Sequence, residues 1–430
     1  MNFSDFRIGV VGLGYVGLNL AVQLSKHFSV VGCDLNETLV KQLKDGVDST
    51  KEVDLEDLRN TSLVLTSRFD DLKNCNFFIV AVPTPATNDG APDLSYVESA
   101  TKSIAEILKK GDIVVYESTV YPGVTEDFCV PILESKGLAH LVDFNVGYSP
   151  ERVNPGDRHH TLTNVVKIVS GDNSDSLETI SWVYEKIVTA GVYRAKTIKV
   201  AEAAKALENT QRDVNIALIN ELSIFFNKVG IDTRDVIEAA GSKYNFMKFY
   251  PGLVGGHCIG VDPYYIISKA KKVGLNVHIL ENAREVNENY SIYVFREMLK
   301  KMLKQESCIG AARKMRVLVL GLTFKENVPD IRNSKVFDII RLMDEFSIEY
   351  EVLDPQADAE MVLAHYGVSI NPQVEDNSFD AVLLAVSHQE YVEAGWSLAK
   401  KYLRSDDGSV FDLKGILSVE GACSYNLWRP

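Results

Sequence analysis

The most constraining feature of this sequence is a glycine-rich turn, Gly12-Leu-Gly-Tyr-Val-Gly17, directly after the apolar run Arg7–Val11. Residues 18–26, which follow, have the apolar spacing of an amphipathic helix. A strand, a G-x-G-x-x-G turn and a helix in this order are typical of the start of a Rossmann fold, because the glycines let backbone N–H groups approach a pyrophosphate. We therefore expect an α/β domain that binds a dinucleotide.

The next apolar run, 28–33, ends at Asp34, which stands 17 residues after Gly17. An acidic residue about 20 residues after the fingerprint accepts hydrogen bonds from ribose hydroxyls in such folds. A carboxylate there also repels a 2′-phosphate, so NAD is favoured over NADP. The alternative is that Asp34 only ends a strand. The expected NAD residues of this region are Gly12, Gly14, Tyr15, Val16, Gly17 and Asp34.

Later apolar runs at 76–82, 113–115, 144–148, 165–170 and 192–195 predict further strands of the same sheet. Loops at the carboxyl ends of strands are where open α/β sheets bind ligands. Thr119 lies in such a loop and can either contact a ligand or cap a turn. Glu151 and Arg152 lie in a proline-rich loop, where they either face a cleft or form an exposed salt bridge.

Residues 197–229 have the spacing of one long helix, about 50 Å in length. Such a helix can join two domains and pack against its own copy. Lys205 and Asn209 lie four residues apart and share a face of it, although a lysine on a helix is usually solvated. We expect short helices at 231–240, 263–272 and 291–303 and a polar linker at 304–314.

The segment 251–265 contains the strongest candidate for chemistry, Cys258. Gly255 and Gly256 shortly precede it, and Asp262 follows four residues later. Glycines favour an exposed turn, where a thiolate can attack a carbonyl carbon while a nearby carboxylate moves protons or positions a water. The alternative is that Cys258 is a small buried residue and Asp262 a turn former.

The α/β alternation restarts at 315–320, with Gly321 after the strand but no further glycines at fingerprint spacing. Lys325, Arg332 and Lys414 lie in loops after strands of this region, where cations suit phosphates. We expect a nucleotide other than NAD here. The predicted fold is α/β, with an NAD-binding Rossmann-like domain at 1–196, a helical domain at 197–303 and a second Rossmann-like domain at 304–430.

Charge and composition exclude several classes of binding partner and site. The net charge of −14 argues against nucleic acid and anionic membranes, which require basic surfaces. No apolar run approaches the roughly 20 residues of a membrane span. The six cysteines form no C-x-x-C pair, so neither a metal site nor a disulfide framework is indicated. We expect a cytoplasmic protein.

Together these motifs resemble those of the nucleotide-sugar 6-dehydrogenases, the family of UDP-glucose, UDP-N-acetylhexosamine and GDP-mannose dehydrogenases. The match runs in order from Arg7 to about Gly415. Its motifs are G-L-G-Y-V-G-L at Gly12, V-P-T-P at Val82, S-T-V at Ser118, S-P-E-R at Ser149, G-G-H-C at Gly255 and F-K-x-N-x-x-D-x-R at Phe324.

The resemblance implies that the sugar C6 alcohol is oxidised to a carboxylate while two NAD are reduced in succession. Cys258 would capture the aldehyde as a thiohemiacetal, and water would release the later thioester. The matched catalytic residues are Cys258, Lys205, Asn209, Asp262, Glu151 and Thr119. The resemblance adds Thr84, Thr119 and Arg332 to the NAD site. The matched substrate residues are Glu151, Arg152, Lys205, Asn209, Phe249, Gly252, Gly255, Phe324, Lys325 and Lys414.

The sequence departs from the family pattern in two places. Pro155 stands where the UDP-glucose branch has a second glutamate, so a role for a second carboxylate in that loop is not expected. The cysteine loop, G-G-H-C-I-G-V-D-P, resembles that of the UDP-N-acetylhexosamine enzymes. We expect a UDP-N-acetylglucosamine or UDP-N-acetylgalactosamine 6-dehydrogenase, a homodimer or larger, that serves surface polysaccharide synthesis. The alternatives are UDP-glucose, UDP-ManNAc or GDP-mannose as substrate, a single-step NAD sugar-acid dehydrogenase, and an inactive NAD-binding scaffold.

Overall fold

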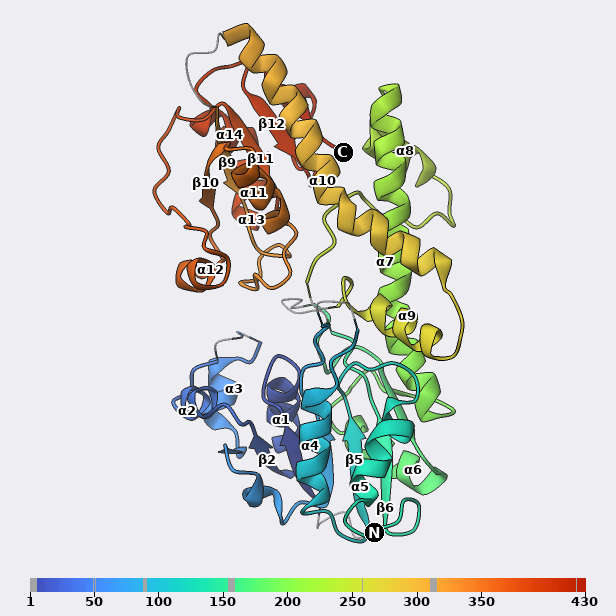
Figure 1. Cartoon of the computed structure of the whole chain (residues 1–430). Helices are drawn as coiled ribbons and strands as arrows, with labels where there is room; N and C mark the ends of the chain where they lie inside the picture. Colours follow the sequence, from blue (N-terminus) through green and yellow to red (C-terminus); the bar gives the residue numbers. More distant parts are fainter. Residues whose placement is uncertain are drawn as a thin grey trace. The chain divides into compact units, whose positions relative to one another are not determined.

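The computed structural model describes residues 6–48, 50, 52–87, 91–153, 159–256, 258–309, 315–422 and 424–430, without the side chains of 305–309. The chain forms two compact units. The first comprises Met1–Glu208 and Tyr264–Asn276, and the second Asn209–Pro263 and Val277–Pro430. Each unit contains a mainly parallel sheet with helices around it (Figure 1), so the predicted α/β fold class is confirmed.

The sheet of the first unit has eight strands within the described residues, in the order β3-β2-β1-β4-β5-β6-β7-β8. Neighbouring strands run parallel except β6 and β7. The order reverses between β1 and β4, the kind of position at which such sheets bind ligands. The strands are β1 (Arg7–Val11), β2 (Ser29–Cys33), β3 (Val64–Thr66), β4 (Phe77–Val80), β5 (Asp112–Tyr116), β6 (Phe144–Tyr148), β7 (Lys167–Gly171) and β8 (Val192–Arg194).

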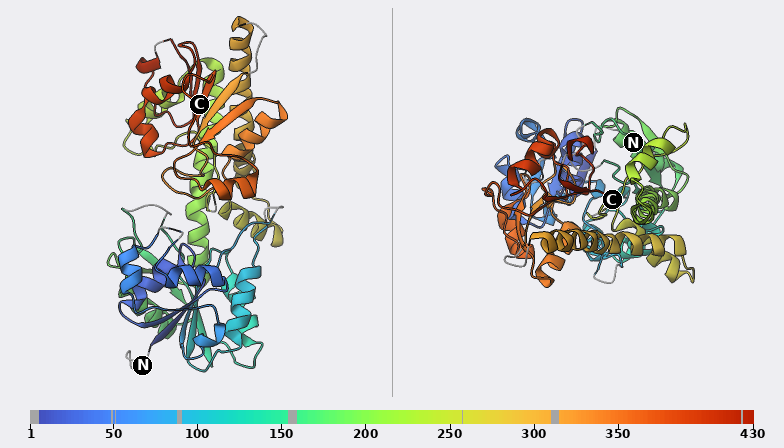
Figure 2. Two further views of the ribbon diagram at one scale, coloured as in Figure 1. Left: turned by 90° about the vertical axis from the view of Figure 1, so that its left-hand side faces the viewer. Right: turned by 90° about the horizontal axis from the view of Figure 1, so that it is seen from above.

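Both faces of this sheet are buried. Ile8 and Val10 of β1 belong to one hydrophobic cluster and Val11 to another, because alternate residues point to opposite faces. Helices cover each face (Figure 2), as in other doubly wound sheets. They are α1 (Gly17–Ser25), α2 (Glu37–Lys44), α3 (Leu55–Asn60), a 3₁₀ turn (Phe69–Leu72), α4 (Ser95–Ala105), a π-helical turn (Val124–Cys129), α5 (Val130–Glu134) and α6 (Ser174–Glu185).

The long helix predicted at 197–229 is confirmed as α7 (Ile198–Val229). The division between the two units falls inside this helix, after Glu208. Two shorter helices, α8 (Thr233–Ala240) and α9 (Asp262–Lys272), flank the segment that contains Cys258. Cys258 itself therefore precedes a helix and is not part of one.

The second unit has a five-stranded sheet in the part of the chain that is described, in the order β10-β9-β11-β12-β13, with every neighbouring pair parallel. Its order reverses between β9 and β11, which gives this sheet its own switch point. The strands are β9 (Arg316–Leu320), β10 (Glu349–Leu353), β11 (Ala381–Leu384), β12 (Ser409–Asp412) and β13 (Asn426–Trp428). Its helices are α11 (Val336–Glu345), α12 (Ala359–Tyr366), α13 (Gln389–Ala394), α14 (Trp396–Tyr402) and a 3₁₀ turn (Glu420–Ala422).

Helix α10 (His278–Ile309) is longer than the helix predicted at 291–303. Its apolar side chains, among them Tyr290, Phe295 and Met298, pack into the core on one face of the second sheet. The linker predicted at 304–314 is therefore wrong for 304–309, which continue the helix, and 310–314 lie outside the described residues.

The division into domains at 1–196, 197–303 and 304–430 stays a prediction. Packing distributes the middle region over the two compact units, because α10 belongs with the second sheet while most of α9 belongs with the first unit. Among the described residues, no helix is both long and apolar enough to cross a membrane.

Candidate functional site

In the glycine-rich turn after β1, each glycine is required, or left open, for a different structural reason. Gly12 has a φ of +93°, and a Cβ there would lie 2.8 Å from the carbonyl oxygen of Ala81. A Cβ at Gly17 would lie 1.9 Å from the Gly12 carbonyl oxygen, so helix and strand could not approach. A Cβ at Gly14 would meet nothing within 4 Å. The turn therefore needs Gly12 and Gly17 for its own packing, whereas Gly14 keeps open space at the switch point.

Asp34 follows β2 and holds this turn. Its Oδ2 accepts a hydrogen bond from Leu13 N at 2.9 Å, and its Oδ1 accepts one from Asn36 N at 2.9 Å. The side chain is only partly buried. The open space at Gly14 and the accessible carboxylate together fit the predicted NAD site, in which the turn, including Tyr15 and Val16, would face the pyrophosphate and Asp34 would face a ribose.

The loops after β4 and β5 are joined to each other. Thr84 Oγ1 donates to the Thr119 carbonyl oxygen at 2.7 Å, and Ser118 Oγ donates to the Val82 carbonyl oxygen at 2.7 Å. The hydroxyl of Tyr265 donates to the Thr84 carbonyl oxygen. The two threonines predicted at the NAD site thus lie in neighbouring loops at the carboxyl edge of the first sheet.

Glu151 is held by backbone and by a buried cation. Its Oε1 accepts hydrogen bonds from Arg152 N and Val153 N, both at 2.6 Å. Its Oε2 lies 3.9 Å from Lys167 Nζ, which also binds Glu117 Oε2 at 3.0 Å. Glu117 also accepts a hydrogen bond from the hydroxyl of Tyr184. Burial raises the pKa of Glu117, against the opposing effect of Lys167.

Arg152 does not pair with the Glu151 side chain, so the salt bridge considered for these neighbours is absent here. Its guanidinium donates to the Val166 carbonyl oxygen at 2.9 Å and contacts Glu208 Oε1 at 2.7 Å. Both partners belong to the first unit. Pro155, whose side chain distinguishes this loop from the UDP-glucose branch, lies outside the described residues.

Lys205 and a second ionisable residue are buried on α7. Lys205 is 9% exposed. Glu202, one turn earlier, is fully buried and accepts hydrogen bonds from Gly123 N and Thr125 N at the start of the π-helical turn. Burial raises the pKa of Glu202 to about 7. Glu202 thus fixes the end of the loop that begins at Thr119.

Cys258 and Asp262 form one turn of the second unit. The Cys258 carbonyl oxygen accepts hydrogen bonds from Val261 N at 3.1 Å and Asp262 N at 2.9 Å, which places the cysteine at the N-terminal end of α9. Asp262 is buried, and its Oδ2 accepts a hydrogen bond from Asn209 Nδ2. Cys258 is exposed, so the alternative of a buried structural cysteine is wrong.

The backbone before Cys258 is closely packed. A Cβ at Gly255 would lie 2.3 Å from the Asn333 carbonyl oxygen. Gly256 has a φ of +78°, and a Cβ there would lie 2.6 Å from the ring of Phe324. Phe324, a predicted substrate residue, therefore lies against the cysteine loop, and both glycines are required by their neighbours.

The switch point of the second sheet has an aspartate like Asp34. Asp354 follows β10, and its Oδ2 accepts hydrogen bonds from Leu322 N and Thr323 N. Here the carboxylate is fully buried and contacts His388 Nε2 at 3.2 Å. Burial opposes ionisation, but the hydrogen bond and charge of His388 keep the pKa of Asp354 below its usual value. This carboxylate is enclosed, unlike Asp34.

The remaining predicted residues of the second unit lie in three loops, with Lys325 and Arg332 together between β9 and α11. Arg332 forms a double ion pair with Asp330, with Nε–Oδ1 at 2.9 Å and NH2–Oδ2 at 2.6 Å. The Lys325 carbonyl oxygen accepts from Thr323 Oγ1 at 2.9 Å. Lys414 follows β12, and burial lowers its pKa. Phe249 and Gly252 lie in the segment between α8 and the cysteine.

Three family models match this chain in order. The NAD binding domain of the UDP-glucose/GDP-mannose dehydrogenase family matches residues 6–188. The central domain of the same family matches residues 199–289, and its UDP binding domain matches residues 318–419. The matched segments contain the glycine turn, the cysteine loop and the second switch point, respectively.

Relatives match over almost the whole chain. The sequence is 49% identical to the UDP-N-acetyl-D-glucosamine 6-dehydrogenase of Pseudomonas aeruginosa, over 97% of this chain and 98% of that protein. It is 48% identical to Protein CapL of Staphylococcus aureus, over 98% and 99%. The solved UDP-D-ManNAc dehydrogenase of Pyrococcus horikoshii has a TM-score of 0.88 at 31% identity, over 99% of both chains.

Proposed function

Because the chain belongs to the UDP-glucose/GDP-mannose dehydrogenase family, we propose that it oxidises the C6 alcohol of a UDP-N-acetylhexosamine to the carboxylate. It is an NAD-dependent oxidoreductase. The choice of sugar is supported by the 49% identity to a UDP-N-acetyl-D-glucosamine 6-dehydrogenase, compared with 32% to a UDP-N-acetyl-D-mannosamine dehydrogenase of Pyrococcus horikoshii.

The observation that best supports Cys258 as the nucleophile is its exposure. Cys33, Cys75 and Cys129, in contrast, are buried. A thiolate adds to the aldehyde carbon that the first oxidation leaves, and the carbonyl oxygen takes up a proton. The resulting sp³ carbon can be oxidised again, to a thioester. Water then breaks the carbon–sulfur bond, which releases the uronate and restores the thiolate.

NAD, when bound, accepts one hydride in each of the two oxidations. One alcohol, one water and two NAD⁺ thus give one carboxylate, two NADH and three protons. We assign NAD binding to the turn of the first unit that Gly12 and Gly17 shape, with Gly14 and Asp34 facing the cofactor.

The remaining roles follow from charge and hydrogen bonding. We propose that Lys205 stabilises negative charge on the C6 oxygen and that Asn209 holds that oxygen as well as Asp262. Glu151 and Asp262 would move protons and orient water, and Thr119 would hold that water. Phe324, Lys325 and Lys414 of the second unit would bind the UDP portion, as the family match to a UDP binding domain supports.

The proposal includes a homodimer or larger assembly in the cytoplasm. It is supported by exposed apolar side chains along α7, a helix that the sequence pattern already favours as a packing surface. These side chains are Val200, Leu207, Leu218, Phe225 and Val229. Cytoplasmic location is supported by the use of free nucleotide cofactors.

The decisive experiment compares the wild type with Cys258→Ser. The wild type should make two NADH for each uronate. The serine variant should fold but lose most uronate production, because an alkoxide forms far less readily than a thiolate at neutral pH. Unimpaired uronate formation by the variant, or one NADH per substrate in the wild type, would contradict the mechanism.

A panel of nucleotide sugars tests which sugar the enzyme prefers. NADH production should be fastest, as kcat/KM, with UDP-N-acetylglucosamine or UDP-N-acetylgalactosamine. UDP-glucose, UDP-ManNAc and GDP-mannose should be poor substrates. A preference for any of these three would leave the reaction class intact and change only the assigned sugar.

A further inference from the structure

The segment that leads to Cys258 is held by two asparagine side chains. Gly252 N donates to Asn220 Oδ1 at 2.9 Å, and Asn220 Nδ2 donates to the Gly252 carbonyl oxygen at 3.0 Å. Four residues later, Gly256 N donates to the Asn333 carbonyl oxygen at 3.3 Å, and Asn333 Nδ2 donates back to the Gly256 carbonyl oxygen at 3.5 Å. The second contact is two residues from Cys258.

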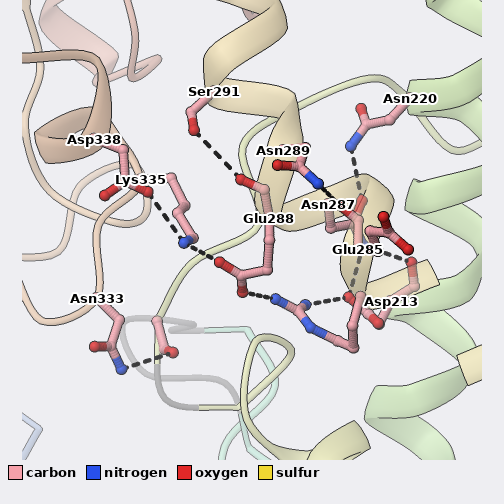
Figure 3. Close-up of polar contacts among 12 residues, drawn as sticks. Asp213, Asn220, Glu285, Asn287, Glu288, Asn289, Ser291, Asn333, Lys335 and Asp338 are labelled. Carbon is pink, nitrogen blue, oxygen red and sulfur yellow. Dashed lines mark hydrogen bonds and ion pairs between the residues drawn. The ribbon is translucent and has the colours of Figure 1, made fainter. Parts of the chain in front are cut away.

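Consecutive residues of α10 connect to both contacts. Asn287 Oδ1 accepts a hydrogen bond from Asn220 Nδ2 at 2.9 Å. Glu288 binds the ammonium of Lys335, which stands two residues after Asn333. Figure 3 shows Lys335 between Glu288 of α10 and Asp338 of α11, with Asn333 beside it. The two supports of the cysteine segment are therefore connected to consecutive residues of the same helix.

A buried arginine, Arg284, links Glu288 of α10 to Asp213 of α7. Arg284, only 2% exposed, binds Asp213 Oδ1 of α7 at 2.6 Å and also binds Glu288. Asn287 Nδ2 donates to the same Asp213 Oδ1 at 2.7 Å. The charges alternate along the series Asp213, Arg284, Glu288, Lys335 and Asp338.

Buried ion pairs are a poor source of stability, because desolvation offsets most of their attraction, and apolar residues of similar volume often stabilise as well or better. Here the fully buried pair is Asp213–Arg284, and its geometry is restricted because Arg284 and Asn287 both donate to the same Asp213 oxygen.

The Gly255 backbone packs so closely against Asn333 that a Cβ at Gly255 would lie 2.3 Å from the Asn333 carbonyl oxygen. A shift of Asn333 would therefore act, through this contact and its hydrogen bonds with Gly256, on the backbone that leads to Cys258.

We infer that the network of Asp213, Arg284, Asn287, Glu288 and Lys335 positions the cysteine segment through Asn220 and Asn333. These are positioning residues, which set where the Sγ of Cys258 stands relative to its substrate. The inference rests on the proposed function of Cys258 as nucleophile. A misplacement of about 1 Å at a reacting group can cost about 100-fold in rate.

Two variants break the network at different points. Asn220→Asp keeps the shape and can still accept from Gly252 N, but it loses both donated hydrogen bonds and places a carboxylate oxygen opposite two acceptors. Lys335→Met removes the ammonium bound by Glu288. Lys300→Met is the matched control, because Lys300 is on α10, the helix that carries Glu288, and its ammonium pairs with Glu297, outside the network.

Three measurements are made on each full-length variant: kcat, the rate of iodoacetamide alkylation at Cys258 followed by mass spectrometry, and NAD affinity by calorimetry. Asn220→Asp and Lys335→Met should lower kcat by about tenfold or more and change the Cys258 alkylation rate. NAD affinity should stay within about twofold, and the control should match the wild type. Asn220→Asp should recover part of its kcat at lower pH, where a protonated carboxyl can donate again.

A purely structural role predicts a different result. If both variants melt at lower temperature but keep the kcat and the Cys258 alkylation rate of the wild type, the inference is wrong. Failure of the proposed function gives another pattern, in which Cys258→Ser retains uronate production. In that case the alkylation rates still decide whether the network positions the thiol. Lys335→Met, at a side chain that is 19% exposed, remains informative if Asn220→Asp does not fold.

Discussion

Two glycines of the first turn, Gly12 and Gly14, are alike in sequence but have opposite surroundings. Gly12 has a positive φ and backbone atoms within 3 Å of its missing Cβ, whereas Gly14 faces open space. The fingerprint motif predicts both as ligand contacts. The structure separates a glycine needed for folding from one that leaves room for a cofactor.

Alanine substitutions should separate these roles. Gly12→Ala should destabilise the protein by about 1–3 kcal/mol, because it adds backbone strain and a clash. Gly14→Ala should leave the melting temperature nearly unchanged but lower NAD affinity by about tenfold or more, since the methyl group occupies the space meant for the pyrophosphate. Calorimetric melting and NAD titration provide the two measurements. A large loss of stability in Gly14→Ala would contradict this assignment.

Glu202 is expected to make the free energy of unfolding depend on pH. Its pKa is raised from 4.5 to about 7 in the folded protein, mainly by burial. Between these values the folded state keeps a proton that the unfolded chain has released, so stability falls as pH rises from about 4.5 through 7, by on the order of 3 kcal/mol. Glu202→Gln cannot titrate. Its melting temperature should therefore rise relative to the wild type between pH 5 and 8.

Scanning calorimetry across that pH range gives the measurement. Other titrating groups change both proteins equally, so only the difference in melting temperature is informative. A difference that stays constant from pH 5 to 8 would mean that Glu202 does not titrate in this window.

At the scale of elements, helix α7 carries the prediction about assembly. Its exposed Leu218 and Phe225 are 52% and 56% exposed in the single chain, which is unfavourable for large apolar side chains gathered along one helix. Leu218→Glu or Phe225→Glu should therefore shift the protein from dimer toward monomer at micromolar concentration. Light scattering measures the mass.

The control for this test is Leu303→Glu, at a leucine that is 54% exposed on α10. It adds the same charge to a helix that is not assigned to the interface, so the dimer should persist. A wild-type protein that is already monomeric would refute the assembly.

The two long helices differ in how well the sequence predicts them. The bounds of α7 agree with the predicted 197–229 to within one residue, because apolar residues recur along all of it. The start of α10 is missed by 13 residues, since the buried positions there include polar residues, Arg284 and Asn287. An apolar pattern cannot reveal a helix whose first turns are held by buried ion pairs.

At the scale of the whole molecule, the two sheets should bind their nucleotides independently. Gly14→Ala should weaken NAD binding and leave UDP affinity unchanged. Lys325→Met should weaken UDP binding by about tenfold, because a charge-assisted phosphate contact is lost, and leave NAD affinity unchanged. Calorimetry on the full chain tests both. Loss of both ligands in either variant would contradict the assignment of one nucleotide to each sheet.

The sequence predicts features formed by residues close together in the chain well, and contacts between residues far apart in the chain poorly. The glycine turn, the strands and the exposure of Cys258 follow from residues close together in the chain. Lys167 and Glu117 are 50 residues apart, and Asn220 and Asn287 are 67 apart, so no local pattern indicates that they meet. Asp354 and His388 are ordinary residues in sequence, and their pairing depends on the folded sheet.

Asp34 and Asp354 have the same place in their sheets, each accepting backbone N–H groups from the turn after the first strand. The carboxylate closes that turn whichever nucleotide the sheet binds. The two carboxylates differ on the side that faces away from the turn. That side is accessible at Asp34, whereas the imidazole of His388 covers it at Asp354. The same folding contact therefore occurs in both sheets, while the covering of its outer side decides whether the carboxylate is free to receive a ribose hydroxyl.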